Sequence, residues 1–315
     1  MTRWLTALVG AIVLAVVTVA LAGSGGRGPE APIGQRPVRV VATTNFLADM
    51  AREIGGDRVQ VTSLMGPGVD PHSYKASASD VATLRDGDLL LYVGLNLEGR
   101  MGDWFEEMAR RTTVVAVTDD IPRTALRRSP AHPDQVDPHV WLDTGLWSSS
   151  AEVIARALAD VDPAGATGYR RRGARYAARL SALDREVRAT LARIPGRERV
   201  LVTSHDAFGY FGRAYGFEVA GIQGTSTVTQ ATTDDIERVS DLVASRGIRA
   251  IFIESSISPQ TIHAVREASA RKGQPVEIGA ELYADSAGGA GTAGDSYIGM
   301  IRANAQRIAG GLAGR

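Results

Sequence analysis

The sequence predicts an α/β protein with two lobes, each built on a mainly parallel sheet, joined by one long helix. Short β-type runs alternate with helical segments through most of the chain, as parallel strands require because they need crossover connections. One amphipathic segment, residues 162–195, is much longer than the helices around it. The alternation resumes after it, so we interpret this segment as the link between the lobes.

Composition indicates a globular protein that is not drawn to polyanions. The chain has 315 residues and 44% apolar content, enough to bury a substantial core. Lysine plus arginine equals aspartate plus glutamate at 35 each, so no net field favours nucleic acid or anionic lipid. The sequence has no cysteine, which excludes disulfides, thiolate metal sites and cysteine nucleophiles. Any metal must be held by nitrogen and oxygen.

The N-terminus has the pattern of a secretory signal. A basic start precedes an uncharged run from Trp4 to Ala22, which ends in Ala20-Leu21-Ala22 as a cleavage site would. We predict a signal peptide at residues 1–22 and a flexible tether at 23–37. The alternative is an uncleaved anchor, because the run is long enough to span a bilayer. Leu21-Ala-Gly-Ser24 resembles a lipoprotein box with serine in place of cysteine. Either way the body is expected to be periplasmic.

The first lobe, residues 38–161, is predicted from its β-type runs and the caps between them. Thr43-Thr-Asn45 follows the first run and can cap the next helix. Gly66-Pro-Gly-Val-Asp70-Pro-His72 ends the second run in a loop, which puts His72 where open α/β sheets place their ligands. Strands are expected at 38–41, 59–64, 89–93 and 114–117, and helices at 46–54, 77–85 and 104–110.

The linking helix has clear signals at both ends. Asp162-Pro163 provides a cap and a proline start, and Pro195-Gly196 ends the run. Apolar residues recur between them at steps of three, four and seven, so a continuous helix over 163–194 would be about 48 Å long. The second lobe, residues 196–315, then repeats the alternation. Its strands are expected at 200–203, 217–222, 250–253 and 276–278, and its helices at 206–215, 233–245, 259–271 and 297–312.

Three of the five histidines, and one later carboxylate, have settings that suit a metal site. Imidazole nitrogen together with carboxylate oxygen suits Zn²⁺ and its borderline neighbours. We therefore hypothesise one divalent-metal site between the lobes, formed by His72, His139, His205 and Asp285. The four settings are Asp70-Pro-His72, Asp137-Pro-His139-Val-Trp-Leu-Asp143, Ser204-His205-Asp206 and Tyr283-Ala-Asp285-Ser286.

Each of these residues has a structural alternative. His139 would be a core histidine bonded to a carboxylate, and His72 a loop residue beside a turn. His205, expected just past the end of a strand, would be the neighbour of a helix cap. Asp285 would be only a turn residue before two glycines.

The remaining histidines and several carboxylates have smaller expected roles. His263 is interpreted as structural, and His132, flanked by Pro130 and Pro133, as solvent-facing with at most an auxiliary metal role. A carboxylate that accepts the second ring N–H of a histidine fixes its tautomer, and we expect no more than two of five candidates to do so. The five candidates are Asp70, Asp137, Asp143, Asp206 and Glu254.

Five motifs occur in the order found in a known family. They are Gly68-Val-Asp-Pro-His72-Ser-Tyr74, Asp137-Pro-His139-Val-Trp-Leu-Asp143, Ser204-His205-Asp-Ala-Phe-Gly-Tyr210, Gly221-Ile-Gln-Gly224, and Asp285-Ser286 through Tyr297-Ile-Gly-Met300. Together they resemble the zinc/manganese solute-binding proteins of metal ABC importers, from Val38 to Leu312. The segment after Tyr74 lacks prolines that many relatives carry, and only His132 stands where some have a long histidine-rich loop.

The resemblance implies two lobes bridged by a long rigid helix, with a metal in the cleft held by His72, His139, His205 and Asp285. It implies a periplasmic, monomeric capture protein that delivers Zn²⁺ to a membrane permease and is not an enzyme. A periplasmic metallochaperone is a further implied partner. Histidine at the third ligand position, His205, favours Zn²⁺, and Mn²⁺ is the alternative cargo.

Other functions compete with metal capture. An exported zinc metallohydrolase would use the same ligand types, but the chain has neither a His-Glu-x-x-His helix nor a Gly-x-Ser-x-Gly elbow. A binding protein should also fill the coordination shell rather than leave a position open for water. A surface adhesin or metal buffer is a third alternative. Metal binding needs neutral imidazoles, so affinity is expected to fall as the pH drops through about 6.5.

Overall fold

The computed structural model describes residues 31–130 and 132–313. The chain divides into two units, Met1–Arg36 and Pro37–Arg315. Of the first, only residues 31–36 are described, with a bridge between Ile33 and Arg36. The predicted signal peptide and most of the predicted tether therefore lie outside the described residues. Among the described helices, none is both long and apolar enough to cross a membrane.

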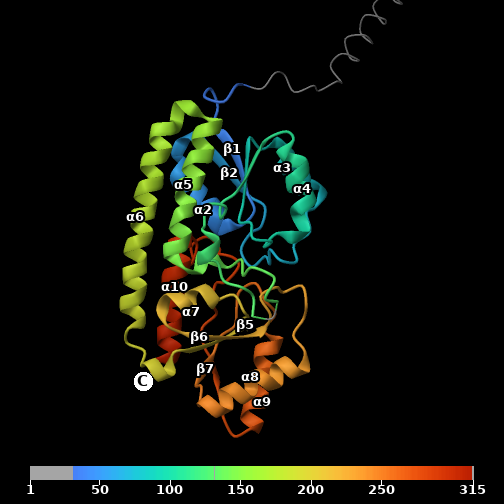
Figure 1. Ribbon diagram of the computed structural model, residues 1–315, viewed down its shortest axis with the longest axis vertical. Coiled ribbons are helices and arrows are strands. Elements are labelled where there is room, and N and C mark those ends of the chain that lie inside the picture. The colour runs from blue at the N-terminus through green and yellow to red at the C-terminus, as the bar shows by residue number, and fades with distance from the viewer. Residues whose placement is uncertain (1–30, 131, 314–315) are drawn as a thin grey trace, which may run out of the picture. The chain divides into compact units, whose positions relative to one another are not determined.

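The first half of the compact unit contains one four-stranded sheet in the order β2-β1-β3-β4 (Figure 1). All three pairings are parallel, which confirms the sheet type predicted from the alternation. The central strands β1 and β3 consist mainly of Val and Leu, as expected for strands that are covered on both faces. The strands are β1 (Val38–Ala42), β2 (Val59–Ser63), β3 (Leu89–Tyr92) and β4 (Thr113–Ala116).

Helices cover both faces of this sheet. α3 and α4 lie on one side, where Leu84 and Phe105 pack with Val41 and Leu90, and α2 and α5 lie on the other (Figure 1). α3 starts with a complete capping box, formed by Ser77 and Asp80. The helices are α2 (Asn45–Gly55), α3 (Ala78–Asp86), α4 (Gly102–Ala109) and α5 (Thr144–Val161).

Helix α5 has no counterpart among the elements predicted from the sequence. Its first turns contain Gly145 and three consecutive serines, which are weak helix formers. The start is fixed instead by Asp143, whose carboxylate accepts from the backbone N of Gly145 (3.0 Å) and of Leu146 (3.2 Å). Burial of the apolar face, including Trp147, stabilises the rest of the helix.

The long helix α6 spans Ala166–Leu191, 26 residues or about 39 Å, and is shorter than the predicted 163–194. Residues Pro163–Gly165 form a 3₁₀ turn before it. Asp162 does not cap α6, because its carboxylate is held by Arg58 (2.7 and 2.8 Å). α6 packs against α5 and α2 of the first half and against α10 of the second (Figure 1).

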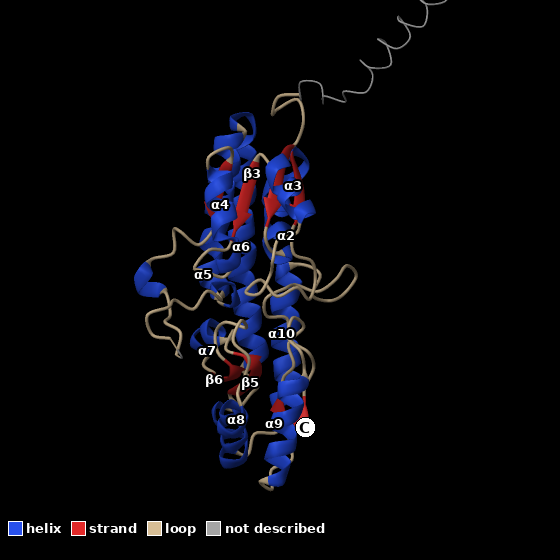
Figure 2. Cartoon of the chain, turned by 90° about the vertical axis from the view of Figure 1, so that its right-hand side faces the viewer, coloured by secondary structure: helices blue, strands red, loops and turns tan. Residues whose placement is uncertain are grey.

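The second half contains two parallel strand pairs, β5-β6 and β7-β8. The backbone N of Phe252, just after β7, donates to Val202 O (2.9 Å) and places β7 beside β5. Figure 2 shows the strands of the two halves at separate levels along the long helices. The strands are β5 (Val200–His205), β6 (Glu218–Gln223), β7 (Ala250–Ile251) and β8 (Glu277–Ile278).

Four helices complete this half. α8 and α9 pack on the strands through an aliphatic core that includes Val239, Val243 and Ile262. α10 returns alongside α6, and Arg302 of α10 forms an ion pair with Glu186 of α6 (2.6 and 2.9 Å). The helices are α7 (Gly209–Tyr215), α8 (Thr233–Arg246), α9 (Gln260–Arg271) and α10 (Tyr297–Leu312).

The close packing of α5 on α6 depends on Gly173, which generates a stability prediction. A Cβ at this position would lie 2.9 Å from Ala155 Cβ and 3.1 Å from Ala151 O. Gly173→Val should therefore lower the free energy of unfolding by about 2 kcal/mol, because the helices must separate. Gly310 of α10 is the control, because a Cβ there would meet nothing within 4 Å. Gly310→Val should change the free energy of unfolding by less than about 0.5 kcal/mol. Urea unfolding measures both, and equal stabilities would contradict the role of Gly173.

Candidate metal centre

The structure brings together the four residues hypothesised as metal ligands. One potential ligand atom from each of His72, His139, His205 and Asp285 lies within 4.8 Å of the others, and all four residues are buried. His72 is in the loop after β2, His139 in the turn before α5, and Asp285 in the loop before α10. His205 is the last residue of β5, not a residue past its end as the sequence suggested. Residues 206–208 form a turn, so the helix predicted at 206–215 starts only at Gly209.

The distances within this cluster match the edges of a small coordination shell. The Nε2 atom of His139 lies 3.2 Å from the Nε2 atoms of both His72 and His205. Asp285 oxygens lie 3.3 Å from His205 Nε2, 3.4 Å from His139 Nε2 and 3.8 Å from His72 Nε2. A tetrahedron with metal–ligand bonds of about 2.0–2.1 Å has edges of about 3.3 Å. The cluster is therefore the right size for one ion.

Two of the imidazole rings are oriented by carboxylates behind them. Asp137 Oδ1 lies 2.8 Å from His139 Nδ1, and Glu254 Oε2 lies 2.5 Å from His205 Nδ1. A carboxylate at Nδ1 holds the proton there and leaves the Nε2 lone pair free. In the neutral rings the two Nε2 lone pairs, 3.2 Å apart, face one another, and a proton or a metal ion between them relieves their repulsion.

Asp285 is the most unusual group in the cluster. Its residue is 1% exposed, and neither carboxylate oxygen has a hydrogen-bond donor in the described part of the chain. Burial alone would raise its pKa, but the charges of the His205 and His139 rings hold the pKa well below its usual value. A buried carboxylate without donors is costly unless positive charge compensates it. The site is thus built for a cation.

The histidines differ in how they bind protons without metal. Burial lowers the pKa of His72 to about 4. Burial acts the same way on His139, but the hydrogen bond to Asp137 and the negative charge of Asp285 outweigh it and raise the pKa to about 9. The pKa of His205 is also raised well above its usual value, by the charges of Glu254 and Asp285 acting against burial. Protons on His139 and His205 therefore occupy the site when no metal does.

Of the five carboxylates considered as partners of the rings, two contact a ring N–H. They are Asp137 and Glu254, which agrees with the expectation of at most two. Asp70 accepts from the backbone N of His72 (2.9 Å), and Asp143 caps α5. Asp206 makes no such contact among residues 31–130 and 132–313, and burial raises its pKa.

Three aromatic residues hold the segments of the site together through hydrogen bonds that residue spacing could not predict. Trp141 Nε1 donates to Ala284 O (2.8 Å), which connects the His139 turn to the Asp285 loop. Tyr297 Oη donates to Trp141 O (2.7 Å), and Tyr210 Oη donates to Asp137 O (2.9 Å). These partners are 73 to 156 residues apart in the chain, so local patterns could not pair them.

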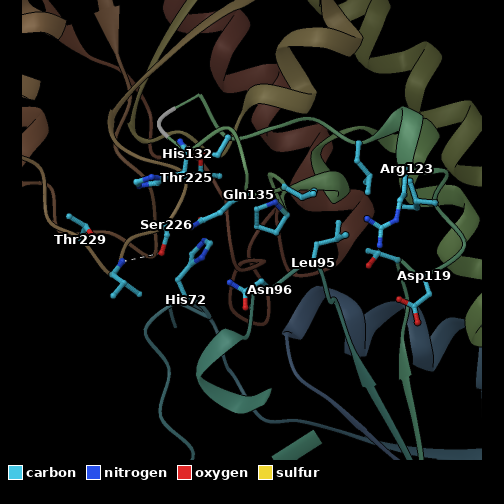
Figure 3. A pocket seen from close by; sticks show the side chains of 17 residues that line it. His72, Leu95, Asn96, Asp119, Arg123, His132, Gln135, Thr225, Ser226 and Thr229 are labelled. Carbon is cyan, nitrogen blue, oxygen red and sulfur yellow. Dashed lines mark hydrogen bonds between the residues drawn. The ribbon is translucent and has the colours of Figure 1, made fainter. Parts of the chain in front are cut away.

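A cavity of about 600 Å³ lies next to the cluster (Figure 3). Of the four cluster residues, only His72 lines it. His132 also lines this cavity, is exposed and is not part of the cluster. His263 lies on α9, half-buried and likewise outside the cluster.

The two-lobed fold and the buried His₃Asp cluster define the class of solute-binding proteins of metal ABC importers. A family model described as zinc-uptake complex component A, periplasmic, matches residues 40–311. The chain belongs to this family, as the resemblance of its motifs indicated.

Individual relatives agree with this assignment. The chain is 43% identical over 274 residues to the zinc-binding protein TroA of Treponema pallidum (strain Nichols), covering 87% of this chain and 88% of that protein. It is 41% identical over 302 residues to the manganese-binding lipoprotein MntA of Bacillus subtilis (strain 168), covering 96% and 97%. The solved structure of the periplasmic zinc-binding protein TroA matches with a TM-score of 0.86 and 42% identity, over 88% of this chain and all of that one.

The contacts of Glu254 generate a prediction for metal affinity. Its two oxygens accept from the His205 backbone N (2.8 Å) and from Nδ1. In Glu254→Gln one acceptor becomes an NH₂ group facing a donor, so Zn²⁺ affinity should fall about 10- to 100-fold. Asp206→Asn, which changes a half-buried acid without a ring contact, should change Zn²⁺ affinity less than about threefold. Competition with a chromophoric chelator measures both, and equal losses would contradict the role of Glu254.

Proposed function

We propose that the protein captures Zn²⁺ outside the cytoplasm and delivers it to an ABC permease for import. His72, His139, His205 and Asp285 bind the ion as cargo, in a nearly closed shell. The observation that carries the proposal is the buried Asp285 carboxylate, which faces three imidazole Nε2 atoms and has no hydrogen-bond donor among residues 31–130 and 132–313. A divalent cation satisfies all four groups at once.

The ligand set favours Zn²⁺ over Mn²⁺. Three imidazole nitrogens and one carboxylate suit a tetrahedral borderline ion, whereas Mn²⁺ prefers more oxygen ligands and a higher coordination number. The 3.2 Å separations between Nε2 atoms suit the short bonds of Zn²⁺. Manganese import is the second candidate, and the 41% identity to the manganese-binding MntA supports it.

The same geometry argues for a carrier and against an exported metallohydrolase. A catalytic zinc keeps a coordination position for water, which needs access to substrate. Here His139 and His205 are fully buried, and their neighbouring carboxylates Asp137 and Glu254 are already bonded to the rings. No carboxylate in this pair is free to act as a base on metal-bound water. We propose no enzymatic activity.

The partners and chain divisions complete the proposal. The permease is the required partner, the protein is a monomer, and a periplasmic metallochaperone is a further partner. The protein is periplasmic after export by the signal at residues 1–22, with a tether at 23–37. The lobes comprise residues 38–161 and 196–315, and residues 162–195 link them.

Metal content tests the function directly. The purified protein should contain one Zn²⁺ per chain by elemental analysis and should prefer Zn²⁺ to Mn²⁺ by about 100-fold or more in competitive titration. Zn²⁺ should also raise the melting temperature through mass action. His139→Ala should abolish most of this shift, and His263→Ala, outside the cluster, should retain it. Absence of stoichiometric metal, or an unchanged shift in His139→Ala, would contradict the proposal.

The pH dependence of Zn²⁺ binding follows from the protons that the ion replaces. Because the raised pKa of His139 is about 9, protons compete with Zn²⁺ below that pH and affinity should fall as pH decreases. Competition thus begins well above the pH of 6.5 expected for a free histidine. His72, with a pKa of about 4, adds no competition near neutrality. At pH 7.5 binding should release protons, because the pKa values of both His139 and His205 are raised.

Calorimetry in buffers of different ionisation enthalpy counts these protons. Equal dissociation constants at pH 7.5 and pH 5, or no proton release, would contradict the prediction.

A further inference from the structure

The four proposed ligands differ in their access to solvent. His72 is 5% exposed, whereas His139 and His205 are 0% exposed. His72 is also the cluster residue that lines the large cavity, and Figure 3 shows its ring directed into it. An ion passing between the cluster and this cavity therefore passes His72.

His72 is held in place differently from the other two histidines. Its ring is not backed by Asp70, which accepts instead from its backbone N (2.9 Å). The loop that carries it, residues 66–73, is attached to the described residues of the second half by two hydrogen bonds. Gly68 N donates to Ser286 Oγ (2.9 Å), and Thr227 Oγ1 donates to Asp70 Oδ2 (2.6 Å). The Asp70 carboxylate thus connects Thr227 directly to the backbone of His72.

Thr227 is itself anchored to the strand that pairs with the His205 strand. Gln223, the last residue of β6, is the register partner of His205. Its Nε2 atom donates to Thr227 O (3.0 Å) and to Thr229 O (2.5 Å). The segment containing Thr227 is therefore fixed relative to His205. Through the Thr227–Asp70 hydrogen bond, this segment also fixes the loop that carries His72. Residues of both halves line the cavity beside it (Figure 3).

We propose that the Thr227–Asp70 hydrogen bond is a latch that controls metal exchange, with Thr227 as a positioning residue for His72. The proposal rests on the proposed metal-binding function. While the latch is closed, His72 Nε2 stays 3.2 Å from His139 Nε2. When it opens, loop 66–73 can move away from the second half and expose the ion to the cavity. His139 and His205 need not move, because Asp137 and Glu254 hold them.

The neighbouring contacts provide matched controls. Ser73 Oγ also donates to Asp70 Oδ2 (2.7 Å), but it lies in the same loop and makes no connection to the second half through this bond. Thr229 lies in the same segment as Thr227 and takes part through its carbonyl rather than its hydroxyl. Loss of either hydroxyl should leave the latch closed.

The test is the rate at which Zn²⁺ leaves the full-length protein into excess chelator. Thr227→Val, which keeps the shape but lacks the hydroxyl, should speed release about tenfold, because a hydrogen bond to a charged group is lost. Thr227→Ser should release within about twofold of the wild-type rate, as should Ser73→Ala and Thr229→Ala. Thr227 is half-buried in a loop, so Thr227→Val should keep the wild-type circular dichroism and bind one Zn²⁺ per chain.

Two results would overturn the latch while leaving the proposed function intact. One is wild-type release from a Thr227→Val protein that binds one Zn²⁺. The other is release from Ser73→Ala as fast as from Thr227→Val, which would show that only the bonding of Asp70 matters. If Thr227→Val binds no Zn²⁺, Thr227→Ser decides. Release of Zn²⁺ from Thr227→Ser at close to the wild-type rate supports the latch. Faster release, or no Zn²⁺ binding by Thr227→Ser, overturns it. A wild-type protein that binds no Zn²⁺ refutes the proposed function and the latch together.

Discussion

The buried carboxylate of Asp285 is the constraint on which the rest of the site depends. It has no hydrogen-bond donor among the described residues, so only positive charge can compensate for its lost hydration. In the metal-free protein that charge comes from protonated His139 and His205, whose pKa values are raised. A divalent ion that displaces two protons leaves the total charge of the site unchanged. Capture then exchanges protons for one ion, and positive charge compensates the buried carboxylate in both states.

The fold meets this constraint by bringing segments of both halves together at the cluster. His72 lies in the loop that follows β2 and His205 ends β5, so each half places a proposed ligand at or beyond the carboxyl end of a parallel strand. His139 and Asp285 lie in connections between elements and are positioned by contacts such as Trp141 Nε1 to Ala284 O. The packing of α6 on α2 and α10 connects the two halves. The spacing of the four side chains therefore depends on how backbone segments from both halves are held together.

Much of this arrangement could be predicted from the sequence, and the failures have physical causes. Alternating strand and helix patterns identified the parallel sheets because binary patterning is a local property. α5 was missed because its start depends on the Asp143 cap and its stability on burial, against weak intrinsic propensity. Asp162 was expected to cap α6, but Arg58, distant in the chain, binds its carboxylate. The candidate ligands could be proposed because each lies in a recognisable motif.

The roles of the supporting residues could not be ranked in the same way. Asp137 precedes His139 by two residues, and a short turn lets the same carboxylate reach the backbone N and the ring. Asp70 has the same spacing from His72 but contacts only the backbone of that residue, and its other oxygen accepts from Thr227. Identical Asp-Pro-His sequences therefore give different contacts. The Asp137 carboxylate bonds within its own turn, whereas the Asp70 carboxylate also accepts from Thr227 of the second half. A carrier must hold its ion firmly and still release it. The two turns meet these demands separately. Asp137 holds the ring of His139, one proposed ligand, inside the protein. Asp70 makes no bond to the ring of His72, another proposed ligand, and connects its loop to the second half.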